Sequence, residues 1–386
     1  MNPWILSAIA VVPWALFPLI VLLRMRGATM LSAYAATPPE RAVLVSVIVP
    51  ARNEAHNIEA CVRSILGSSW PSIEVIVVND SSSDETGAIA AAIARMDTRL
   101  HVLDAPPLPD GWMGKQWACH TGAAAARGDF LLFTDADTRY TPELVTRAVN
   151  ALRARAADLL SVGGAQLMET FWERLLQPHI FWILAARYGS PDTMSRSTNP
   201  INKIANGQFM LVTRSAYAAE GGHAAVRHHV AEDLRIAQEW TRHGRSVQLV
   251  MTTDEFATRM YRGLGEVARG WGKNIYAAGR DTVPLGRVGQ RLLRAIFPLP
   301  ALWEVVPALV AIGWAAGWVG TAFGAWGAAA WLCNTIARAV VHHLMRAPLW
   351  MAPLNPLAAV VIGGISAGAA WRGSRVTWKD RSYVSG

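Results

Sequence analysis

Long uncharged runs of hydrophobic residues occur at both ends of the chain, and a more polar region lies between them. Residues 4–23 carry no charge, and further apolar segments occupy 298–318, 322–341 and 350–371. About 20 apolar residues suffice to cross the hydrocarbon core of a bilayer. The pattern therefore predicts an N-terminal transmembrane helix and two to three C-terminal ones. A cleaved signal peptide is the alternative for residues 4–23, although the basic residues follow this segment rather than precede it.

Basic residues beside the apolar segments predict the orientation. Arg24 and Arg26 directly follow the first segment, and basic residues next to a membrane helix favour the cytoplasmic side. This places the N-terminus outside and the polar region in the cytoplasm, as in a multi-pass protein of the cell (inner) membrane. Basic residues also follow the last apolar segment, namely Arg372, Arg375, Lys379 and Arg381.

The polar region alternates between short β-branched runs and helical patterns. The runs at 44–50, 73–79, 100–104 and 130–134 predict strands, and the stretches between the first three have helical character. Such alternation is typical of an α/β fold, in which helices cover both faces of a mostly parallel sheet. Ligands of these sheets bind beyond the carboxyl ends of the strands.

Six parts follow from these patterns. One of them mixes Arg287, Arg291 and Arg294 with apolar residues, which is typical of an interfacial amphipathic segment or of a basic connector. The predicted parts are an N-terminal transmembrane helix (1–26), a linker (27–43), an α/β domain (44–280), an interfacial amphipathic segment (281–300), the C-terminal transmembrane helices (301–371) and a basic tail (372–386).

Composition adds constraints on partners and compartment. The chain of 386 residues is 52% hydrophobic and has a net charge of +8, which suits contact with anionic lipid. A basic stripe interleaved with aromatic residues, expected of a nucleic-acid-binding protein, is missing from the sequence. Three scattered cysteines, Cys61, Cys119 and Cys333, suggest neither a disulfide framework nor a cysteine metal site, as expected in a reducing compartment.

Acidic side chains follow three of the predicted strands. Glu54 lies after the first, Asp80 after the second, and Asp135 and Asp137 after the fourth. In an extended chain residues i and i+2 point to the same side, so we expect Asp135 and Asp137 to face one cleft. Oxygen ligands of this kind suit Mg²⁺ or Mn²⁺ shared with substrate phosphates. The alternatives are a solvated loop for the D-x-D sequence, a helix cap for Asp80 and a dipole partner for Glu54.

A second acidic pair, Glu232 and Asp233, precedes an amphipathic helical pattern. A carboxylate in a cleft can act as the general base for an attacking hydroxyl, and helix capping is the alternative. Lys115 lies in a Gly-flanked loop before a helix, where it is either a phosphate contact or a solvated lysine. Nearby histidines raise the alternative of a zinc site, although the other histidines are distant in sequence; the nearby ones are His223, His228 and His229.

Several stretches occur in an order that resembles family 2 glycosyltransferases with the GT-A fold. They are VSVIVPARNEAHNIEACVRSIL, VIVVNDSSSDET and GDFLLFTDADT, followed by an ED pair in VAEDLRIA. Further stretches resemble a membrane subgroup, the hopanoid-associated and carotenoid (diaponeurosporenoate) glycosyltransferases, which are related to ceramide glucosyltransferases. These are GWMGKQWA, ANGQFMLVTRSAYAAEGGH, RMYRGLGEVARGWGKN and WRGSRVTWKDRSY, the last with Asp380 where the subgroup usually has Gly.

The resemblance implies roles for individual residues. Asp233 matches the catalytic base, Asp137 the metal-binding acid, and Asp135 a residue that reaches ribose or metal. The Q-x-x-R-W motif of processive and ceramide-type enzymes is missing, and Arg269 and Trp271 lie roughly in its place. The predicted nucleotide-sugar contacts are Pro50, Arg52, Glu54, Asp80, Lys115, Asp135, Arg269 and Trp271.

The expected reaction is an inverting, metal-dependent transfer of a sugar from a nucleotide-sugar, expected to be a UDP-hexose, to the hydroxyl of a membrane lipid. A single base and a single displacement predict inversion, whereas retaining hydrolases use a second carboxylate as nucleophile. Transfer to a polyprenyl phosphate is an alternative that Arg259 and Arg262 keep open. A catalytically silent scaffold or lipid transporter is another, for which Asn334 and Arg338 are the polar residues within apolar segments. Because these two residues weaken the segment 322–341, we favour two full C-terminal crossings together with an irregular or interfacial segment.

Overall fold

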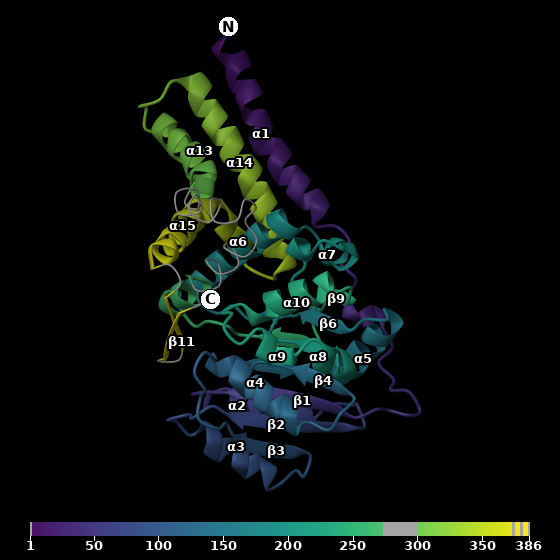
Figure 1. Cartoon of the computed structure of the whole chain (residues 1–386). Coiled ribbons are helices and arrows are strands. Elements are labelled where there is room, and N and C mark those ends of the chain that lie inside the picture. The colour runs from purple at the N-terminus through teal and green to yellow at the C-terminus, as the bar shows by residue number, and fades with distance from the viewer. Residues whose placement is uncertain (1, 273–298, 373–374, 379–380, 385–386) are drawn as a thin grey trace. The chain divides into compact units, whose positions relative to one another are not determined.

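The computed structural model of the chain describes residues 2–272, 299–372, 375–378 and 381–384 (Figure 1). It comprises two compact units. The helical unit consists of Met1–Arg26, Met168–Ser190 and Tyr261–Gly373, and the α/β unit consists of Gly27–Leu167, Pro191–Met260 and Ser374–Gly386. The predicted interfacial segment 281–300 lies almost entirely outside the described residues.

The predicted fold class is confirmed in the α/β unit, whose central sheet is mostly parallel. The strand order is β3-β2-β1-β4-β8-β6-β9, and only β8 runs antiparallel to its neighbours β4 and β6. The four predicted strands are present at nearly the predicted bounds. The strands of this sheet are β1 (Val45–Ala51), β2 (Ile73–Asn79), β3 (Leu100–Asp104), β4 (Phe130–Phe133), β6 (Leu159–Gly163), β8 (Met210–Thr213) and β9 (Val247–Met251).

Helices cover both faces of this sheet because successive strand side chains point to opposite sides. On β1, Val47 and Val49 belong to one buried cluster and Ile48 to the other. The first cluster includes residues of α2 (Ile58–Leu66), α3 (Thr86–Ala94) and α5 (Leu144–Ala154). The second includes residues of α4 (Gly114–Ala125), α8 (Arg214–Ala219) and α10 (Glu232–Arg242). Each face of the sheet thus has its own hydrophobic core.

Short elements complete the α/β unit. A small sheet has the order β5-β10-β7, and its strands are β5 (Thr138–Tyr140), β7 (Ala165–Gln166) and β10 (Phe256–Thr258). A hairpin of β11 (Arg375–Trp378) and β12 (Arg381–Val384) lies within the predicted basic tail. The short helical elements are η1 (Leu31–Ala33), α7 (Pro191–Arg196), η2 (Pro200–Asn202) and α9 (Gly222–Ala225).

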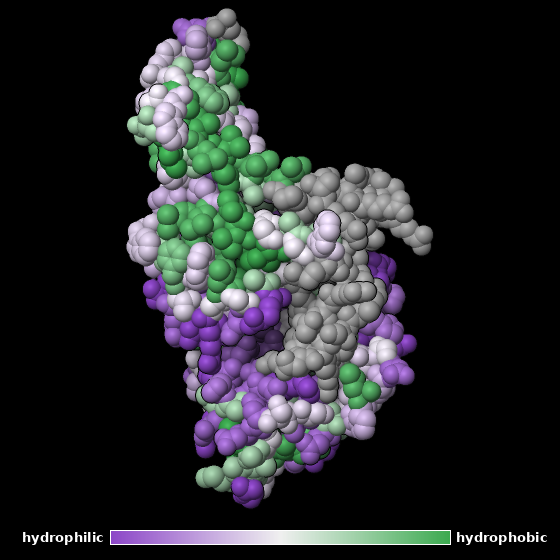
Figure 2. All heavy atoms as spheres, turned by 90° about the vertical axis from the view of Figure 1, so that its left-hand side faces the viewer, coloured by the Kyte–Doolittle hydropathy of each residue, from purple (hydrophilic) through white to green (hydrophobic). Residues whose placement is uncertain are grey.

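The helical unit carries the apolar segments. Among the described residues, two helices are long and apolar enough to cross a membrane, Pro3–Arg24 and Leu349–Trp371, and Leu299–Ala315 is a shorter apolar helix. Green hydrophobic surface covers much of this unit on the face shown in Figure 2. These features indicate membrane association; the number of crossings and the orientation stay predictions. The helices are α1 (Pro3–Arg24), α6 (Phe171–Tyr188), α13 (Leu299–Ala315), α14 (Thr321–Leu344), η3 (Leu349–Leu354) and α15 (Asn355–Arg372).

The segment 27–43, expected to be a linker, is partly built into the α/β unit. Leu31 is fully buried in the core on the α5 face of the sheet. Met30 forms a bridge to Met251 at the end of β9, and Arg147 of α5 donates to the carbonyl of Ser32 at 3.0 Å. This part of the segment therefore contributes to the stability of the unit.

Replacing Leu31 with Ala tests that contribution. We expect the free energy of unfolding of the α/β unit to fall by about 2–4 kcal/mol, because a buried leucine leaves a cavity when truncated. Urea unfolding followed by circular dichroism measures the change. Met96→Ala is the control, since Met96 is 80% exposed; equal effects of the two substitutions would contradict a packed role for this segment.

Candidate active site

The loops after β1 and β2 are joined to each other at the carboxyl end of the sheet. Asp80 directly follows β2, is 2% exposed, and its N–H donates to the carbonyl of Ala51 at 2.8 Å. The Arg52 guanidinium donates to the carbonyls of Asp80 at 2.6 Å and Ser81 at 3.0 Å. Pro50 is paired with Val78 in the parallel register. The structure thus brings the predicted Pro50, Arg52 and Asp80 together.

Side-chain hydrogen bonds fix the same two loops further out. The Glu54 N–H donates to the Thr86 hydroxyl at 2.7 Å, and the Asn53 N–H donates to the Ser82 hydroxyl at 3.1 Å. Asn53 and Ser81 have φ values of 52° and 53°, a left-handed conformation that is unfavourable for residues other than glycine. Strained backbone of this kind persists where surrounding bonds enforce it, and it gathers at functional sites.

Lys115 links the loop after β4 to the start of α10. Its ammonium lies 2.8 Å from a carboxylate oxygen of Asp135 and 2.9 Å from one of Glu232. Burial opposes the charge of this lysine, but the fields of Asp135 and Glu232 outweigh burial and raise the Lys115 pKa well above its usual value. Lys115 is therefore charged and paired, and the solvated-lysine alternative is wrong.

Asp233 lies in the first turn of α10 and accepts two backbone hydrogen bonds. The N–H groups of Gly207 and Leu234 donate to its two oxygens at 2.8 Å each. Burial and the neighbouring Glu232 raise the Asp233 pKa to about 6, while Lys115 acts in the opposite direction. A Cβ atom at Gly207 would lie 3.1 Å from Asp233 Oδ2 and 3.2 Å from Lys115 Nζ. Asp233, the candidate for the catalytic base, and Lys115 therefore both lie next to Gly207.

Asp137 has a buried oxygen without a protein partner. Within the described part of the chain, its Oδ1 has no hydrogen-bond partner. Burial, followed by the charges of Asp135 and Glu54, raises the Asp137 pKa to about 7. Carboxylates from the loops after β1 and β4 thus lie close enough to repel one another. A cation relieves such repulsion, and the orphaned oxygen fits this role.

The chemistry of the acids favours a cation that is shared with a ligand. Among the described residues there is no group of three or more His, Cys, Asp or Glu side chains able to hold a metal ion. Mg²⁺ is commonly held by one or two carboxylates together with substrate phosphates. Asp137, with Asp135 beside it, supplies ligands of that kind.

The local geometry of the D-x-D sequence differs from the prediction. The chain is not extended there, because Ala136 and Asp137 form a turn between β4 and β5. The Thr138 hydroxyl donates to the Asp135 carbonyl at 2.8 Å and stabilises this turn. Alternation along an extended strand is therefore the wrong reason for grouping the two acids, although their charges do act on each other.

Two of the nearby histidines have structural partners. The His223 ring is 1% exposed and its Nδ1 lies 2.9 Å from the Tyr217 hydroxyl. His228 Nδ1 lies 2.6 Å from the Gly111 carbonyl. Both rings fix loops within the α/β unit, which gives no support to the zinc alternative.

Arg269 and Trp271 belong to the helical unit, which is described separately from the α/β unit. Trp271 lies 6.4 Å from Tyr261 between ring centroids. Their predicted role at the donor stays a prediction. Glu232 was noted in the sequence as one of an acidic pair with Asp233, but its role as a partner of Lys115 becomes visible only in the folded structure.

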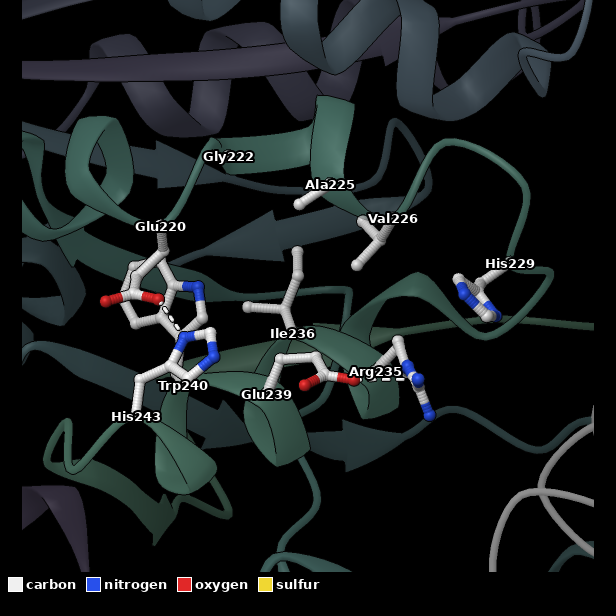
Figure 3. A pocket seen from close by; sticks show the side chains of 10 residues that line it. All are labelled: Glu220, Gly222, Ala225, Val226, His229, Arg235, Ile236, Glu239, Trp240 and His243. Atoms are coloured by element: carbon white, nitrogen blue, oxygen red, sulfur yellow. Dashed lines mark hydrogen bonds and ion pairs between the residues drawn. The ribbon is translucent and has the colours of Figure 1, made fainter.

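A separate hollow of about 190 Å³ lies along α10 (Figure 3). None of the predicted site residues lines it. At one end Glu220 accepts hydrogen bonds from His243 at 2.5 Å and Arg245 at 2.8 Å. At the other, Arg235 and Glu239 form an ion pair of 2.7 Å. Its charged side chains already pair with one another.

The fold and the acids at its sheet edge are typical of a GT-A domain, and comparisons with known proteins agree with this. Residues 46–219, slightly less than half of the chain, match the family described as Glycosyl transferase family 2. The 4,4'-diaponeurosporenoate glycosyltransferase of Staphylococcus aureus (strain MRSA252) is 28% identical over 244 residues. That alignment covers 62% of this chain and 63% of the relative. The predicted resemblance is thereby confirmed.

A solved structure shares the fold across most of the chain. It is titled mannosyltransferase PcManGT from Pyrobaculum calidifontis in complex with GDP-Man and Mn²⁺. The TM-score is 0.56 at 16% identity, and the match covers 94% of this chain and 97% of that one. At this level of identity the likeness concerns the fold.

Metal binding tests the assignment of Asp137. We expect Asp137→Asn to weaken Mn²⁺ binding by about ten-fold or more, because a neutral amide replaces the anionic ligand. Electron paramagnetic resonance of free Mn²⁺, titrated with the purified full chain, measures the affinity. Asp104→Asn, at the exposed end of β3, is the control; unchanged affinity in Asp137→Asn would exclude this aspartate as the ligand.

Proposed function

We propose that the chain is an inverting, metal-dependent glycosyltransferase that moves a hexose from a UDP-sugar to the hydroxyl of a membrane lipid. The observation that carries the proposal is the convergence of Asp135, Glu232 and Asp233 on Lys115, beside the orphaned oxygen of Asp137. The match of residues 46–219 to Glycosyl transferase family 2 supports the reaction class.

The donor is bound by the joined loops after β1 and β2. In this proposal Pro50 and Arg52 frame the nucleotide base, and the buried Asp80 binds the base or ribose. The hydrogen bonds of Arg52 and Asp80 already join the two loops, so little loop ordering is needed when the donor binds. Glu54 shapes the same loop and adds negative charge near Asp137.

Asp137, with Asp135, would hold Mg²⁺ or Mn²⁺. When bound, such a cation would offset the negative charge of the departing nucleoside diphosphate. The protein's own contribution is a second positive group, Lys115, fixed in the first turn of α4 by its two carboxylate partners. A fixed cation stabilises the leaving group without the reorganisation that solvent would need.

Asp233 receives the proton of the acceptor hydroxyl. With a pKa of about 6 it is mostly deprotonated at neutral pH, yet basic enough to accept a proton. The N–H groups of Gly207 and Leu234 fix the orientation of the carboxylate. One base and one direct displacement at the anomeric carbon invert its configuration.

The acceptor is a lipid because the same chain carries two helices able to cross a membrane. The name of the Staphylococcus aureus relative, 4,4'-diaponeurosporenoate glycosyltransferase, supports a lipid-like acceptor, although it denotes a carboxylate rather than an alcohol. We place the protein in the cell (inner) membrane with the catalytic domain in the cytoplasm, since Arg24 and Arg26 follow α1.

Replacement of the base tests the reaction. We expect Asp233→Asn to lower kcat by about 10²–10⁴-fold, because general-base catalysis is lost. The assay measures UDP released from UDP-glucose by the purified protein with Mn²⁺ and lipid extract. Glu239→Gln on the same helix is the control, since Glu239 pairs with Arg235 and Arg242 rather than with the residues of the site. Equal turnover in the parent protein and Asp233→Asn would contradict the proposal and favour a silent scaffold.

The pH dependence follows from the raised pKa of Asp233. A base must be deprotonated to act, so kcat/KM should rise with pH through about 6 and level off above it. An unperturbed aspartate would instead produce this rise near pH 4. Initial rates measured from about pH 4.5 to about pH 8 separate the two cases.

A further inference from the structure

Polar side chains follow one buried face of α14 inside the helical unit. Asn334, Arg338 and His342 occur at intervals of four residues and are 4%, 3% and 3% exposed. Residues four apart lie on the same side of a helix. We call these three residues the α14 polar face. Ionisable residues within membrane helices are rare and commonly mark functional sites.

Two further helices contribute to the surroundings of Arg338. Glu304 of α13, itself 5% exposed, forms an ion pair with the guanidinium. The ring of Trp182 of α6 lies 4.2 Å from the guanidinium carbon. His342 Nδ1 lies 2.9 Å from the Arg338 carbonyl. Three helices of one unit thus meet around a single buried cation.

Several polar atoms of this group have no hydrogen-bond partner among the residues that the structure describes. Both donors and acceptors are affected: Arg338 Nε and Nη1, Asn334 Nδ2, His342 Nε2 and Glu304 Oε2. Buried polar groups in native proteins normally find partners, and leaving them unmatched is unfavourable. The number of unmatched atoms at one place points to a polar group that none of the described residues supplies.

The unmatched atoms specify the chemistry of that group. A hydroxyl donates one hydrogen bond and accepts others, so this one group can pair both with an acceptor such as Glu304 Oε2 and with donors such as those of Arg338 and Asn334. A carboxylate or phosphate only accepts, and its charge would face Glu304. Because Glu304 already balances Arg338, a neutral head is favoured over an anionic one.

An aromatic cluster adjoins the polar group. Trp303, the residue before Glu304, stacks on Trp14 with ring centroids 4.1 Å apart. Phe17 lies 5.7 Å from Trp303 and 6.5 Å from Trp182 between ring centroids. Aromatic side chains beside a charge-balanced polar group suit a molecule that has an apolar body and a polar head.

We propose that the α14 polar face and Glu304 bind the hydroxyl head of an uncharged lipid alcohol, with its hydrocarbon part against the aromatic cluster. This binding goes beyond the proposed function and does not depend on it. If the polar group served only to join the helices, no lipid would depend on it.

Three probes with the same hydrocarbon chain test the head-group preference. Hexadecanol, hexadecanoic acid and hexadecyl phosphate are added to the purified full chain in detergent, and binding is measured by native mass spectrometry. We expect hexadecanol to bind about ten-fold more tightly than either anion, which corresponds to one well-placed hydrogen bond. Tightest binding of an anion, equal binding of all three, or no binding would overturn the proposal.

The substitution Asn334→Leu separates a role of Asn334 in lipid binding from a role in protein stability. It leaves the ion pair of Arg338 and Glu304 in place, so the preference for hexadecanol should disappear while the melting temperature stays equal or rises, because an unmatched polar group is replaced by an apolar one. Ile336→Ala, on the exposed face of α14, is the matched control and should keep the preference. An unchanged preference in Asn334→Leu would contradict the site.

Turnover distinguishes this inference from the proposed function, because the two concern different sites. If hexadecanol binding depends on Asn334 but no sugar is transferred to any lipid, the site stands and the proposed function fails. If sugar is transferred to a lipid alcohol but hexadecanol binding does not depend on Asn334, the proposed function stands and this inference fails.

Discussion

One ammonium group compensates the acidic side chains at the carboxyl end of the sheet. Lys115 pairs with Asp135 and Glu232 and lowers the pKa values of Asp137 and Asp233 against the effect of burial. Without a cation, carboxylates from separate loops at such close range would not all stay ionised. The arrangement keeps Asp233 available as a base and leaves one oxygen of Asp137 for a metal ion.

The scaffold explains why these groups meet. Parallel pairing aligns the ends of β1 and β2, so the loops that carry Arg52 and Asp80 leave the sheet at the same edge. β4 pairs with β1 on its other side and brings Asp135 and Asp137 to that edge. The first turns of α4 and α10 add Lys115 and Glu232. Residues far apart in sequence thereby share one charge network.

Much of the α/β unit was predictable, because β-branched runs and helical spacing are local properties. The helical character of the stretch between the first two predicted strands anticipated α2, whose Ile58, Cys61, Val62 and Ile65 are buried. The roles of Lys115 and Glu232 were harder to predict from the sequence, since an ion pair between residues so distant in sequence depends on the tertiary fold. The turn at Asp137 was missed because alternation assumes an extended chain.

The helical unit shows the same limit of prediction from local sequence. Its helix α6 lies within the predicted α/β domain by sequence, yet Met168–Ser190 groups with the terminal segments. Nothing local marks this assignment, because the helix has apolar residues on most sides and Pro178 in its interior. Likewise Asn334 and Arg338 only weakened a predicted membrane segment, whereas in the structure they lie on one buried face beside Glu304.

The central claim is that Lys115 sets the charge state of the acids around it, and the pH dependence of UDP release in charge variants tests it most directly. In Lys115→Met the acidic limb of the pH profile of kcat/KM should move to higher pH, because the cation that favours the Asp233 carboxylate is removed. In Glu232→Gln the limb should move to lower pH, because the neighbouring negative charge is removed. If kcat/KM rises at the same pH in the parent protein and in both variants, these groups do not share one electrostatic network, and the account is contradicted.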